Sequence, residues 1–421
     1  MKNKKETAEK YRHLKDRASF TMVELVVVLG ILAVLSTVAV LALRPDQLFK
    51  QSRDSKRLSD LQTIHSALAL YLGFSLTGFG DANKVYVSVP DTSATCANLA
   101  LPDLPDGWTY VCKPTATYRN IDGTGWIPVD LSLLFANTGS IFSSLPVDSV
   151  NSVVDGQYYT YITGGSWALT ALLESDKYLR NEASKDGGTD SGRLELGTDL
   201  SLWRQASGLV GYWKFEEGSG TTANDSSNNA NTGTWGGTGS PHYVTGKVQD
   251  YAGSFNGSND EVNVGTGESL NITDNMSVVV WAYPLELKYQ TPLARSTDTA
   301  GIARQFKLYF YGDGRLNFRW FVEDGAYGTL TNCITTGAEY AVGGWYHMVM
   351  TFSNGVVRGY KNGALLKECD QGANTINDSA LPVYIGRDST SYYFNGYIDD
   401  ARIYNRVLSA QEILAMYNAN K

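Results

Sequence analysis

The sequence of 421 residues has few cysteines, histidines and prolines, and it has no excess of positive charge. Its four cysteines form no Cys-x-x-Cys pair and are too few for a disulfide scaffold, which argues against a structural zinc site. Lys and Arg number 35 against 43 Asp and Glu, so the net charge is −8 and nonspecific binding to nucleic acid is not expected.

The familiar catalytic motifs are missing as well. The four histidines are scattered, and the sequence contains no His-Glu-x-x-His, no Gly-x-Ser-x-Gly and no phosphate-binding glycine loop. Glu216 and Glu217 are adjacent, as are Asp399 and Asp400, so on a strand each pair points to opposite faces. A glycosidase needs two carboxyl groups that face one substrate, and we therefore expect that the chain is not an enzyme.

The chain does have enough apolar material to fold. Hydrophobic residues make up 43% and charged residues 19%, which excludes global disorder, and the length suits two or three domains. Glycine (42) and tyrosine (26) are abundant beside 11 prolines, a composition that favours strands and turns.

Charge is unevenly distributed at the N-terminus. Residues 1–19 carry seven basic and three acidic side chains, a net +4, which leaves −12 for the remainder of the chain. From Leu25 to Leu43 nineteen residues carry no charge, and at about 1.5 Å per residue such a helix crosses a bilayer core of about 30 Å. We expect a transmembrane helix over residues 20–43, with its basic flank in the cytoplasm and the chain after Arg44 outside it.

A carboxylate at Glu24 is costly in this apolar segment, so it either stays hydrated at the membrane interface or pairs with another subunit. Residues 18–25, Ala-Ser-Phe-Thr-Met-Val-Glu-Leu, resemble the prepilin processing motif of type IV pilins and type II secretion pseudopilins. The resemblance implies cleavage between Ser19 and Phe20 by a prepilin peptidase and N-methylation of Phe20. It also implies that Glu24 neutralises the N-terminal amine of a neighbouring subunit. Ser19 stands where the family usually has glycine.

A second helical pattern follows the apolar run. Apolar residues recur at spacings of three and four, at Leu58, Leu61, Ile64, Leu68 and Leu72, which predicts an amphipathic helix. Pro45 kinks this helix, or residues 44–46 end one helix and begin another. Pilins resemble this arrangement, with a long N-terminal helix packed on a small sheet.

Residues 73–207 are rich in turns and strands. Residues 158–172 predict a β-hairpin around Gly164–Gly165. Cys96 and Cys112 either bridge a loop here or stay as free buried thiols. Major pseudopilins carry a calcium site in a C-terminal loop comparable to residues 185–192. That resemblance implies calcium ligands at Asp186 and Asp190, whereas the residues alone favour a solvated loop.

In residues 208–421 the sequence pattern changes to short strand-like segments and turns at regular spacing, which predicts a β-sandwich. A hairpin with an Asn362-Gly363 turn and a capping-box pattern at residues 409–412 are its clearest local signals. The whole segment resembles a bacterial laminin-G-like, concanavalin A-like jelly roll. The resemblance is carried by residues 208–220, 225–231, 255–260 and 395–409.

The same resemblance suggests site residues in this domain. Oxygen donors lie in motifs that adjoin a calcium site in related domains, and a role in turns is the alternative: Asp225, Asn229, Asn231 and Asp399. Aromatic residues either stack on sugar rings or pack the core: Trp320, Tyr392 and Tyr393, with Tyr311 and Phe394. Cys333 and Cys369 are candidates for a second disulfide.

We therefore expect an α+β chain in four parts. These are a leader (1–19), a pilin helix (20–72), a head with a small antiparallel sheet (73–207) and an all-β jelly roll (208–421). The expected function is a type IV pilus-like filament subunit, assembled with other pilin subunits on an inner-membrane platform. The jelly roll would bind a glycan or protein ligand outside the cell.

Two alternatives stay open. One is a type II secretion pseudopilin that contacts secreted cargo, and the other is a membrane-anchored carbohydrate-processing enzyme. The expected location is a single pass through the inner membrane, followed by an extracellular or periplasmic filament.

Overall fold

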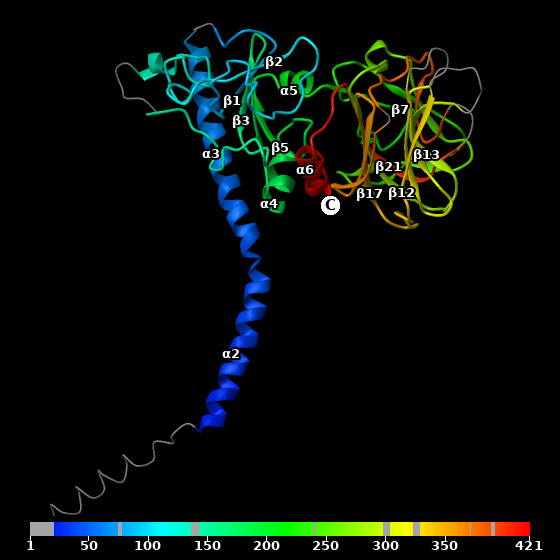
Figure 1. The fold of residues 1–421 in the computed structure, drawn as a ribbon, viewed down its shortest axis with the longest axis horizontal. Helices are drawn as coiled ribbons and strands as arrows, with labels where there is room; N and C mark the ends of the chain where they lie inside the picture. Colours follow the sequence, from blue (N-terminus) through cyan, green and yellow to red (C-terminus); the bar gives the residue numbers. More distant parts are fainter. Residues whose placement is uncertain are drawn as a thin grey trace, which may run out of the picture. The chain divides into compact units, whose positions relative to one another are not determined.

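The computed structural model describes residues 21–421 apart from 75–77, 136–142, 240, 298–303, 323–328, 371 and 389–391. The chain divides into two compact units, Met1–Ser52 and Arg53–Lys421. Figure 1 shows the helices and strands in chain order. The second unit holds a small mixed sheet, which we call the head, and a larger two-sheet sandwich.

Two long helices begin the described chain. Helix α2 (Met22–Leu43) has Thr21 as its N-cap, and the side chain and backbone of Thr21 form a capping box with Glu24. Helix α3 (Pro45–Gly73) follows after Arg44, whose backbone adopts a positive φ of 41°. Of the two interpretations of residues 44–46, a kink or a helix boundary, the helix boundary is confirmed. One helix ends and another begins, with Pro45 in the first helical position.

The expectation of a transmembrane helix needs correction. Crossing a bilayer takes about 20 consecutive and predominantly apolar helical residues. No helix among the described residues is long and apolar enough to cross a membrane. The predicted span over residues 20–43 and the single-pass inner-membrane location are thus wrong. The predicted fold class is corrected with them, because the described part of the chain is mostly β and contains no long transmembrane pilin helix.

The head sheet has the strand order β2-β1-β3-β4-β5, and only the β1–β2 pair is parallel. The expected hairpin at residues 158–172 is confirmed as β3 and β4. The strands are β1 (Lys84–Val87), β2 (Thr109–Val111), β3 (Tyr159–Thr163), β4 (Trp167–Leu172) and β5 (Arg193–Gly197). The short helical turns are η1 (Leu131–Phe135), α4 (Asp176–Tyr178), η2 (Leu179–Ala183) and α5 (Ser201–Ala206).

The amphipathic stripe of α3 covers one face of this sheet. Leu61, Ile64 and Leu68 are fully buried against the rings of Trp126 and Trp167. Leu72, which the pattern placed in the same stripe, is 49% exposed. The opposite face carries a second core that includes the Cys96–Cys112 disulfide. The first of the two expected disulfides is therefore formed.

The sandwich consists of two eight-stranded sheets. The first has the order β19-β18-β17-β12-β21-β10-β9, with β6 also paired to β21. Its strands are β6 (Leu209–Trp213), β9 (Tyr243–Thr245), β10 (Tyr251–Asn256), β12 (Met276–Pro284), β17 (Tyr346–Ser353), β18 (Val356–Lys361), β19 (Ala364–Asp370) and β21 (Asn395–Tyr404). Strands β18 and β19 form the expected hairpin, with Asn362 and Gly363 at φ 52° and 81° in its turn.

The second sheet has the order β16-β15-β14-β13-β20-β11-β8-β7. Its strands are β7 (Thr222–Ala223), β8 (Gly233–Gly236), β11 (Glu261–Gly265), β13 (Gln290–Arg295), β14 (Phe306–Phe310), β15 (Leu316–Val322), β16 (Thr329–Ile334) and β20 (Val383–Ile385). A short turn, η3 (Glu268–Leu270), follows β11. The second expected disulfide, Cys333–Cys369, joins β16 to β19 and so ties the edges of the two sheets.

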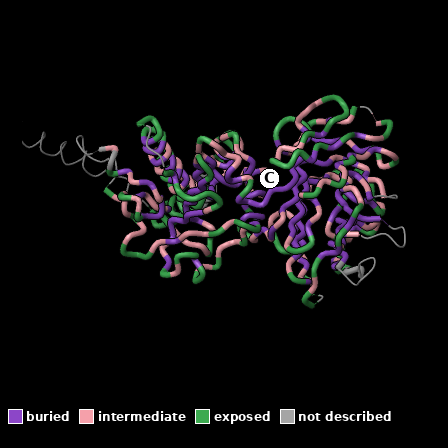
Figure 2. The backbone as a smooth tube through the Cα atoms, turned by 90° about the horizontal axis from the view of Figure 1, so that it is seen from above, coloured by how far each residue is buried: buried purple, intermediate pink, exposed green. Residues whose placement is uncertain are grey.

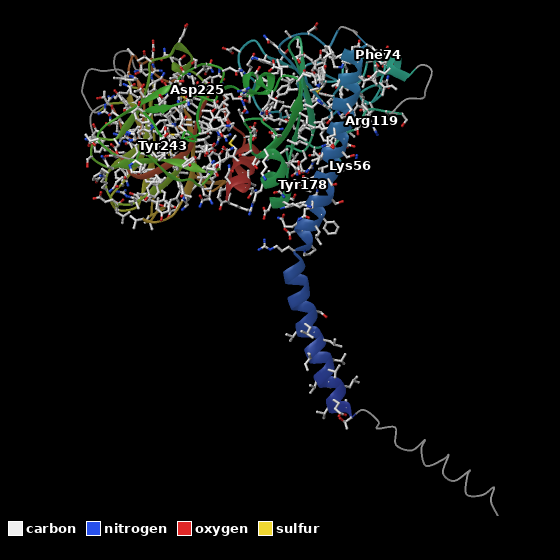
Figure 3. All side chains as sticks on the ribbon, turned by 180° about the vertical axis from the view of Figure 1, so that it is seen from behind. Lys56, Phe74, Arg119, Tyr178, Asp225 and Tyr243 are labelled. Carbon is white, nitrogen blue, oxygen red and sulfur yellow. A yellow bond between two sulfur atoms is a disulfide. The ribbon has the colours of Figure 1, made fainter. Side chains whose placement is uncertain are left out.

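The sandwich core lies between the sheets. Large aromatic side chains fill it, among them Trp213, Phe215, Phe318, Trp320 and Phe352. Figure 2 shows that both the head and the sandwich contain many buried residues. In Figure 3 the labelled Asp225 and Tyr243 lie on the sandwich, whereas Lys56 lies on α3 and Phe74 directly follows its last residue.

Helix α6 (Ala410–Asn420) ends the chain and contacts both parts of the second unit. The expected capping box is confirmed, because Ser409 and Glu412 exchange side-chain and backbone hydrogen bonds. Ile413 and Met416 pack with residues of the first sandwich sheet, and Ala419 belongs to the head core. Figure 1 draws this helix in red between the head strands and the sandwich.

Candidate functional site

The outer surface of the second sandwich sheet carries a group of tyrosines. In β14 the residues alternate, and Phe306, Leu308 and Phe310 are buried in the sandwich core. Successive side chains of a strand point to opposite faces, so Lys307 and Tyr309 lie on the outer face.

Three tyrosines outside the strands surround Tyr309, two next to strands of the second sheet and one shortly before a strand of the first. Tyr289 precedes β13, Tyr311 follows β14 and Tyr392 precedes β21. The ring centroid of Tyr309 lies 5.8 Å from that of Tyr289, 5.1 Å from Tyr311 and 5.2 Å from Tyr392. We call these four residues the tyrosine face. Tyr289 is 54% exposed, whereas Tyr309 is 5% exposed, so the outer rings form a shallow surface above a buried one.

A buried ion pair supports the tyrosine face. Lys307 Nζ donates to Asp388 Oδ2 at 2.7 Å, and both side chains are fully buried. The same ammonium group lies 4.4 Å from the ring centroid of Tyr309 and 4.1 Å from that of Tyr392. Arg319 lies 5.1 Å from the Tyr309 centroid. These cation–π contacts help to hold the rings of Tyr309 and Tyr392 in place.

A second group continues along the same sheet surface. Tyr384 in β20 lies between the core residues Val383 and Ile385, so its side chain points outward. The Arg387 guanidinium lies 4.4 Å from the Tyr384 ring centroid and donates to the Tyr393 hydroxyl at 2.7 Å. It also forms an ion pair with Glu261. Burial raises the pKa of Glu261, and the charge of Arg387 opposes that shift.

The three predicted ligand-binding aromatics have different positions. Trp320 is fully buried between Phe306 and Phe352, so its prediction as a sugar-stacking residue is wrong. Tyr392 belongs to the tyrosine face and Tyr393 lies beside Arg387. Tyr311, also named from the sequence, belongs to the tyrosine face, and Phe394 is buried in the core. Sequence reasoning missed Tyr289 and Tyr309, although the alternation in residues 306–310 was a usable signal for Tyr309.

Three predicted calcium ligands of the sandwich form the hydrogen bonds of a turn. Asp225 Oδ1 accepts from the amides of Tyr212 and Ser227, and its Oδ2 accepts from the Asn231 amide at 2.8 Å. Asn229 and Asn231 both donate side-chain hydrogen bonds to the Val210 carbonyl. The polar groups of this loop hold it against β6, which is the alternative role that the residue types allowed.

Asp399 serves a different loop. Its Oδ2 accepts from the amides of Lys247 and Val248, both at 2.8 Å, while its Oδ1 is buried and has no described hydrogen-bond partner. Burial raises the pKa of this carboxyl group well above its ordinary value. The contacts of Asp399 are therefore separate from those of the Asp225 turn.

Beside the predicted calcium loop of the head, strand β5 carries a third acidic residue, Glu195, that the sequence did not single out. Asp186 accepts from the amides of Gly188 and Glu195, and Glu195 Oε1 accepts from those of Thr189 and Asp190. Glu195 is fully buried, and its Oε2 has no described partner. Burial raises the pKa of Asp186 to about 7 and that of Glu195 to about 8. Among the described residues, no group of three or more His, Cys, Asp or Glu is arranged to hold a metal ion.

The N-terminal predictions are only partly covered by the structure. Ser19 and Phe20, the predicted cleavage and methylation residues, lie outside the described residues. Glu24 Oε2 accepts from the backbone amide and hydroxyl of Thr21 at 2.9 and 2.8 Å. These hydrogen bonds lower the pKa of Glu24. The spacing Thr-x-x-Glu was a capping signal that the motif reading overlooked.

Comparison with known proteins bears on the sandwich alone. Residues 256–414 match the laminin-G model of the Concanavalin A-like lectin/glucanases superfamily. The match supports a laminin-G-like, concanavalin A-like jelly roll in the C-terminal part of the chain. No curated protein matches the sequence. The family match lies within residues 256–414 and does not include the predicted pilin helix.

Several solved structures resemble part of the chain. Domain 4 of the extracellular arabinanase AbnA from Geobacillus stearothermophilus, solved with arabinotriose, is 20% identical, with a TM-score of 0.40 over 49% of this chain and 97% of that one. The binding domain of Paraclostridial Mosquitocidal Protein 1 is 16% identical (TM-score 0.39; 50% and 52% covered). That of botulinum neurotoxin serotype G is 17% identical (0.39; 50% and 50%). The chain thus spans about half of each toxin domain, and TM-scores of this size carry no argument about function.

Proposed function

We propose that the jelly roll binds a glycan on the tyrosine face. The observation that carries this proposal is a group of four tyrosine rings, each of which lies 5.1–5.8 Å from at least one other, at the outer surface of one sheet. An aromatic ring offers an apolar face to the C–H groups of a sugar and a hydroxyl group to its oxygens. The match of residues 256–414 to a lectin-like family is in keeping with this role.

The polar groups of the same surface suit a binding role better than a catalytic one. Asp388 and Glu261 are the carboxylates of this surface described above, and each is paired with a cation, Lys307 or Arg387. A glycosidase needs one carboxyl group that donates a proton and another that attacks or activates water. We therefore propose a binding protein that is not an enzyme, with a protein ligand as the alternative occupant of the tyrosine face.

Substitution of an exposed tyrosine tests the proposal. Tyr289→Ala removes a ring whose side chain is 54% exposed, so the fold should persist while glycan affinity falls about tenfold or more. Tyr251→Ala, an exposed tyrosine of the other sheet, is the matched control and should leave affinity unchanged. The purified full chain and both variants would be compared on a glycan array and then by calorimetry on the best ligand. Equal binding by all three proteins would refute the assignment.

The wider role that we propose is display of this jelly roll on a pilus-like filament. Helix α2 exposes apolar side chains along its described length, from Met22, which is 82% exposed, to Leu35, which is 58% exposed. An apolar surface of this extent is typical of a protein–protein contact. Other copies of α2 would supply them, as the motif at residues 18–25 suggests. A secretion pseudopilin that contacts cargo is the alternative. The two disulfides suit an oxidising compartment outside the cytoplasm.

A calcium ion near Asp186, Asp190 and Glu195 also belongs to the proposal. Its support is the buried Oε2 of Glu195, which has no hydrogen-bond partner among the described residues, although the described carboxylates there are not arranged as a metal site.

A further inference from the structure

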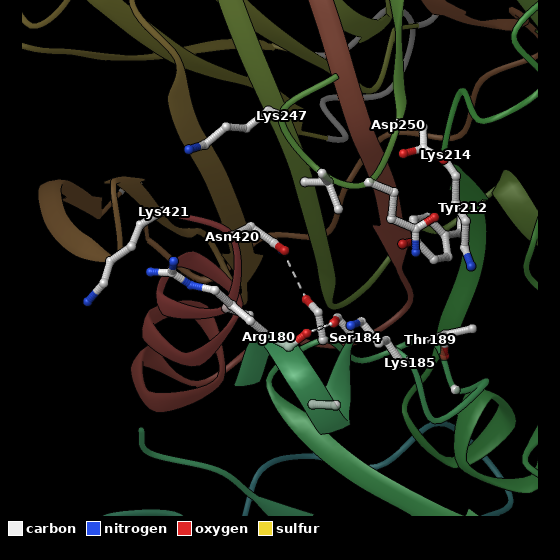
Figure 4. A pocket seen from close by; sticks show the side chains of 16 residues that line it. Arg180, Ser184, Lys185, Thr189, Tyr212, Lys214, Lys247, Asp250, Asn420 and Lys421 are labelled. Atoms are coloured by element: carbon white, nitrogen blue, oxygen red, sulfur yellow. Dashed lines mark hydrogen bonds between the residues drawn. The ribbon is translucent and has the colours of Figure 1, made fainter. Parts of the chain in front are cut away.

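A cavity of about 530 Å³ lies where the head meets the jelly roll, away from the tyrosine face. Three segments of the chain line it. The head contributes Arg180 and residues 183–185, 188, 189 and 191, the jelly roll contributes Tyr212, Lys214 and residues 247–250, and α6 contributes residues 419–421. Figure 4 shows these side chains around the opening. The volume falls within the range of about 300–1,000 Å³ that is usual for small-molecule sites.

The lining of this cavity is strongly basic. Five of its side chains are cationic, and one, Asp250, is anionic. The five are Arg180, Lys185, Lys214, Lys247 and Lys421. Of the ion pairs between described residues, one involves a cavity cation, Lys421 with Asp176 at 3.5 Å. The ammonium groups of Lys214 and Lys247 lie over aromatic rings instead, 5.2 Å from Tyr212 and 5.3 Å from Trp281.

Neutral donors complete the lining. Ser184, Ser191 and Asn420 face the same cavity, and Asn420 Nδ2 donates to Ser191 Oγ at 3.0 Å. Figure 4 marks this hydrogen bond. Hydroxyl and amide groups beside several cations are the donors that recognise the oxygens of phosphate, sulfate or carboxylate groups.

Buried carboxyl groups fix both walls of the cavity. Glu195 accepts from the amides of Thr189 and Asp190 in the head wall, at 2.9 and 2.8 Å. Asp399 accepts from the amides of Lys247 and Val248 in the opposite wall. Walls that are already held in place spend little free energy on ordering when a ligand binds.

We propose that this cavity binds a small oxyanion-bearing ligand, a molecule of up to about disaccharide size that carries a phosphate, sulfate or carboxylate group. The electrostatics agree with the geometry. Burial, followed by the charge of Arg402, lowers the pKa of Lys214, and burial, followed by the charge of Arg180, lowers that of Lys247. A bound anion would stabilise the charged form of both lysines and so offset the cost of burying that charge. Because head and jelly roll share the lining, the ligand would also couple the two.

The experiment uses the full chain and measures thermal unfolding and calorimetric binding at constant ionic strength. The probes are inorganic phosphate, a sulfated disaccharide and the corresponding neutral disaccharide, with chloride as the salt control. We expect saturable binding and a raised Tm with phosphate or the sulfated disaccharide, and neither effect with the neutral one. If only phosphate binds, the ligand is a free anion; if the sulfated disaccharide binds more tightly, it is an acidic sugar.

Variants assign any binding to the cavity. Lys214→Gln combined with Lys247→Gln should weaken anion binding at least tenfold, whereas Lys367→Gln, in β19 and outside the cavity, should not change it. If the double variant fails to fold, Arg180→Gln at an exposed position provides the same test with a smaller loss. Tyr289→Ala should leave anion binding intact, which separates this site from the tyrosine face. No saturable binding, or equal binding by all variants, would overturn the proposal.

Discussion

Glu195 shows how a single buried carboxyl group shapes a loop. One of its oxygens accepts from two backbone amides, and the other is buried without a described partner. Gly188 lies so close that a Cβ added there would come within 2.4 Å of the Glu195 carboxyl group. Burial and the nearby charges of Asp186 and Asp190 raise the pKa of Glu195 to about 8.

This raised pKa predicts a pH dependence of stability. The folded protein holds the proton of Glu195 at pH values where the unfolded chain has lost it. The resulting stabilisation is therefore complete below the ordinary pKa near 4.5 and is lost as the pH rises through about 8. Each pKa unit corresponds to about 1.4 kcal/mol, so a few kcal/mol are at stake. We expect Glu195→Gln to gain stability relative to the native chain between pH 5 and pH 9, as measured by urea unfolding.

Glu268→Gln, at an exposed carboxylate, is the control and should change stability equally at both pH values. Parallel stability curves for the native chain and Glu195→Gln would contradict the prediction. Calcium at pH 9 should restore stability to the native chain and not to Glu195→Gln if a cation binds in this loop.

Helix α3 shows how an element is attached to the head by charge as well as by apolar packing. Arg57 is fully buried, and it donates to Asp54 at 2.7 Å, to Gln157 at 2.9 Å and also to Asp148. Glu174 accepts from both Arg53 and Arg57. Three carboxylates, Asp54, Asp148 and Glu174, thus pair with one buried guanidinium group, and Glu174 alone has Arg53 as a second partner.

Removal of that guanidinium group should be severe. Arg57→Ala leaves carboxylates without their counter-ion in a buried site, which costs about 3–5 kcal/mol of unfolding free energy. Lys56→Ala, one residue earlier, breaks an ion pair with Asp60 whose lysine is half exposed, and should cost about 1 kcal/mol or less. Urea unfolding of both variants measures the difference. Similar losses for the two would show that the network contributes little.

Sequence patterns predicted the elements better than their arrangement. The hairpins at residues 158–172 and 357–366 and the capping box at 409–412 depend on local spacing, and each is present. The parallel β1–β2 pair and the network around Arg57 join residues far apart in the chain, so no local pattern reveals them. Trp320 failed as a ligand residue for a related reason. Its aromatic character suits a core and a binding surface equally, and only the strand register decides between them.

At the scale of the molecule, α6 ties the jelly roll to the head. Arg406 donates to the Ser207 carbonyl and pairs with Glu412, and all three groups are buried. Gln411 and Asn420 donate to Val154 and Ser191 of the head. Because these contacts join the jelly roll to the head, we expect the two to move together, which suits the proposed display of the jelly roll.

Assembly into a filament requires a processed N-terminus, which gives the last prediction. In cells with a prepilin peptidase, the chain should be cut between Ser19 and Phe20, because the motif around Glu24 presents a small residue before the cleavage point. Intact mass and N-terminal sequencing should find a mature chain that begins at methylated Phe20. Ser19→Gly, which restores the residue usual in pilins, should be cut at least as completely. Glu24→Ala should be cut normally but should no longer assemble, because a neutral side chain cannot pair with the amine of a neighbouring subunit. A chain that still begins at Met1 would rule out the filament role and leave the jelly roll as a binding domain without this assembly.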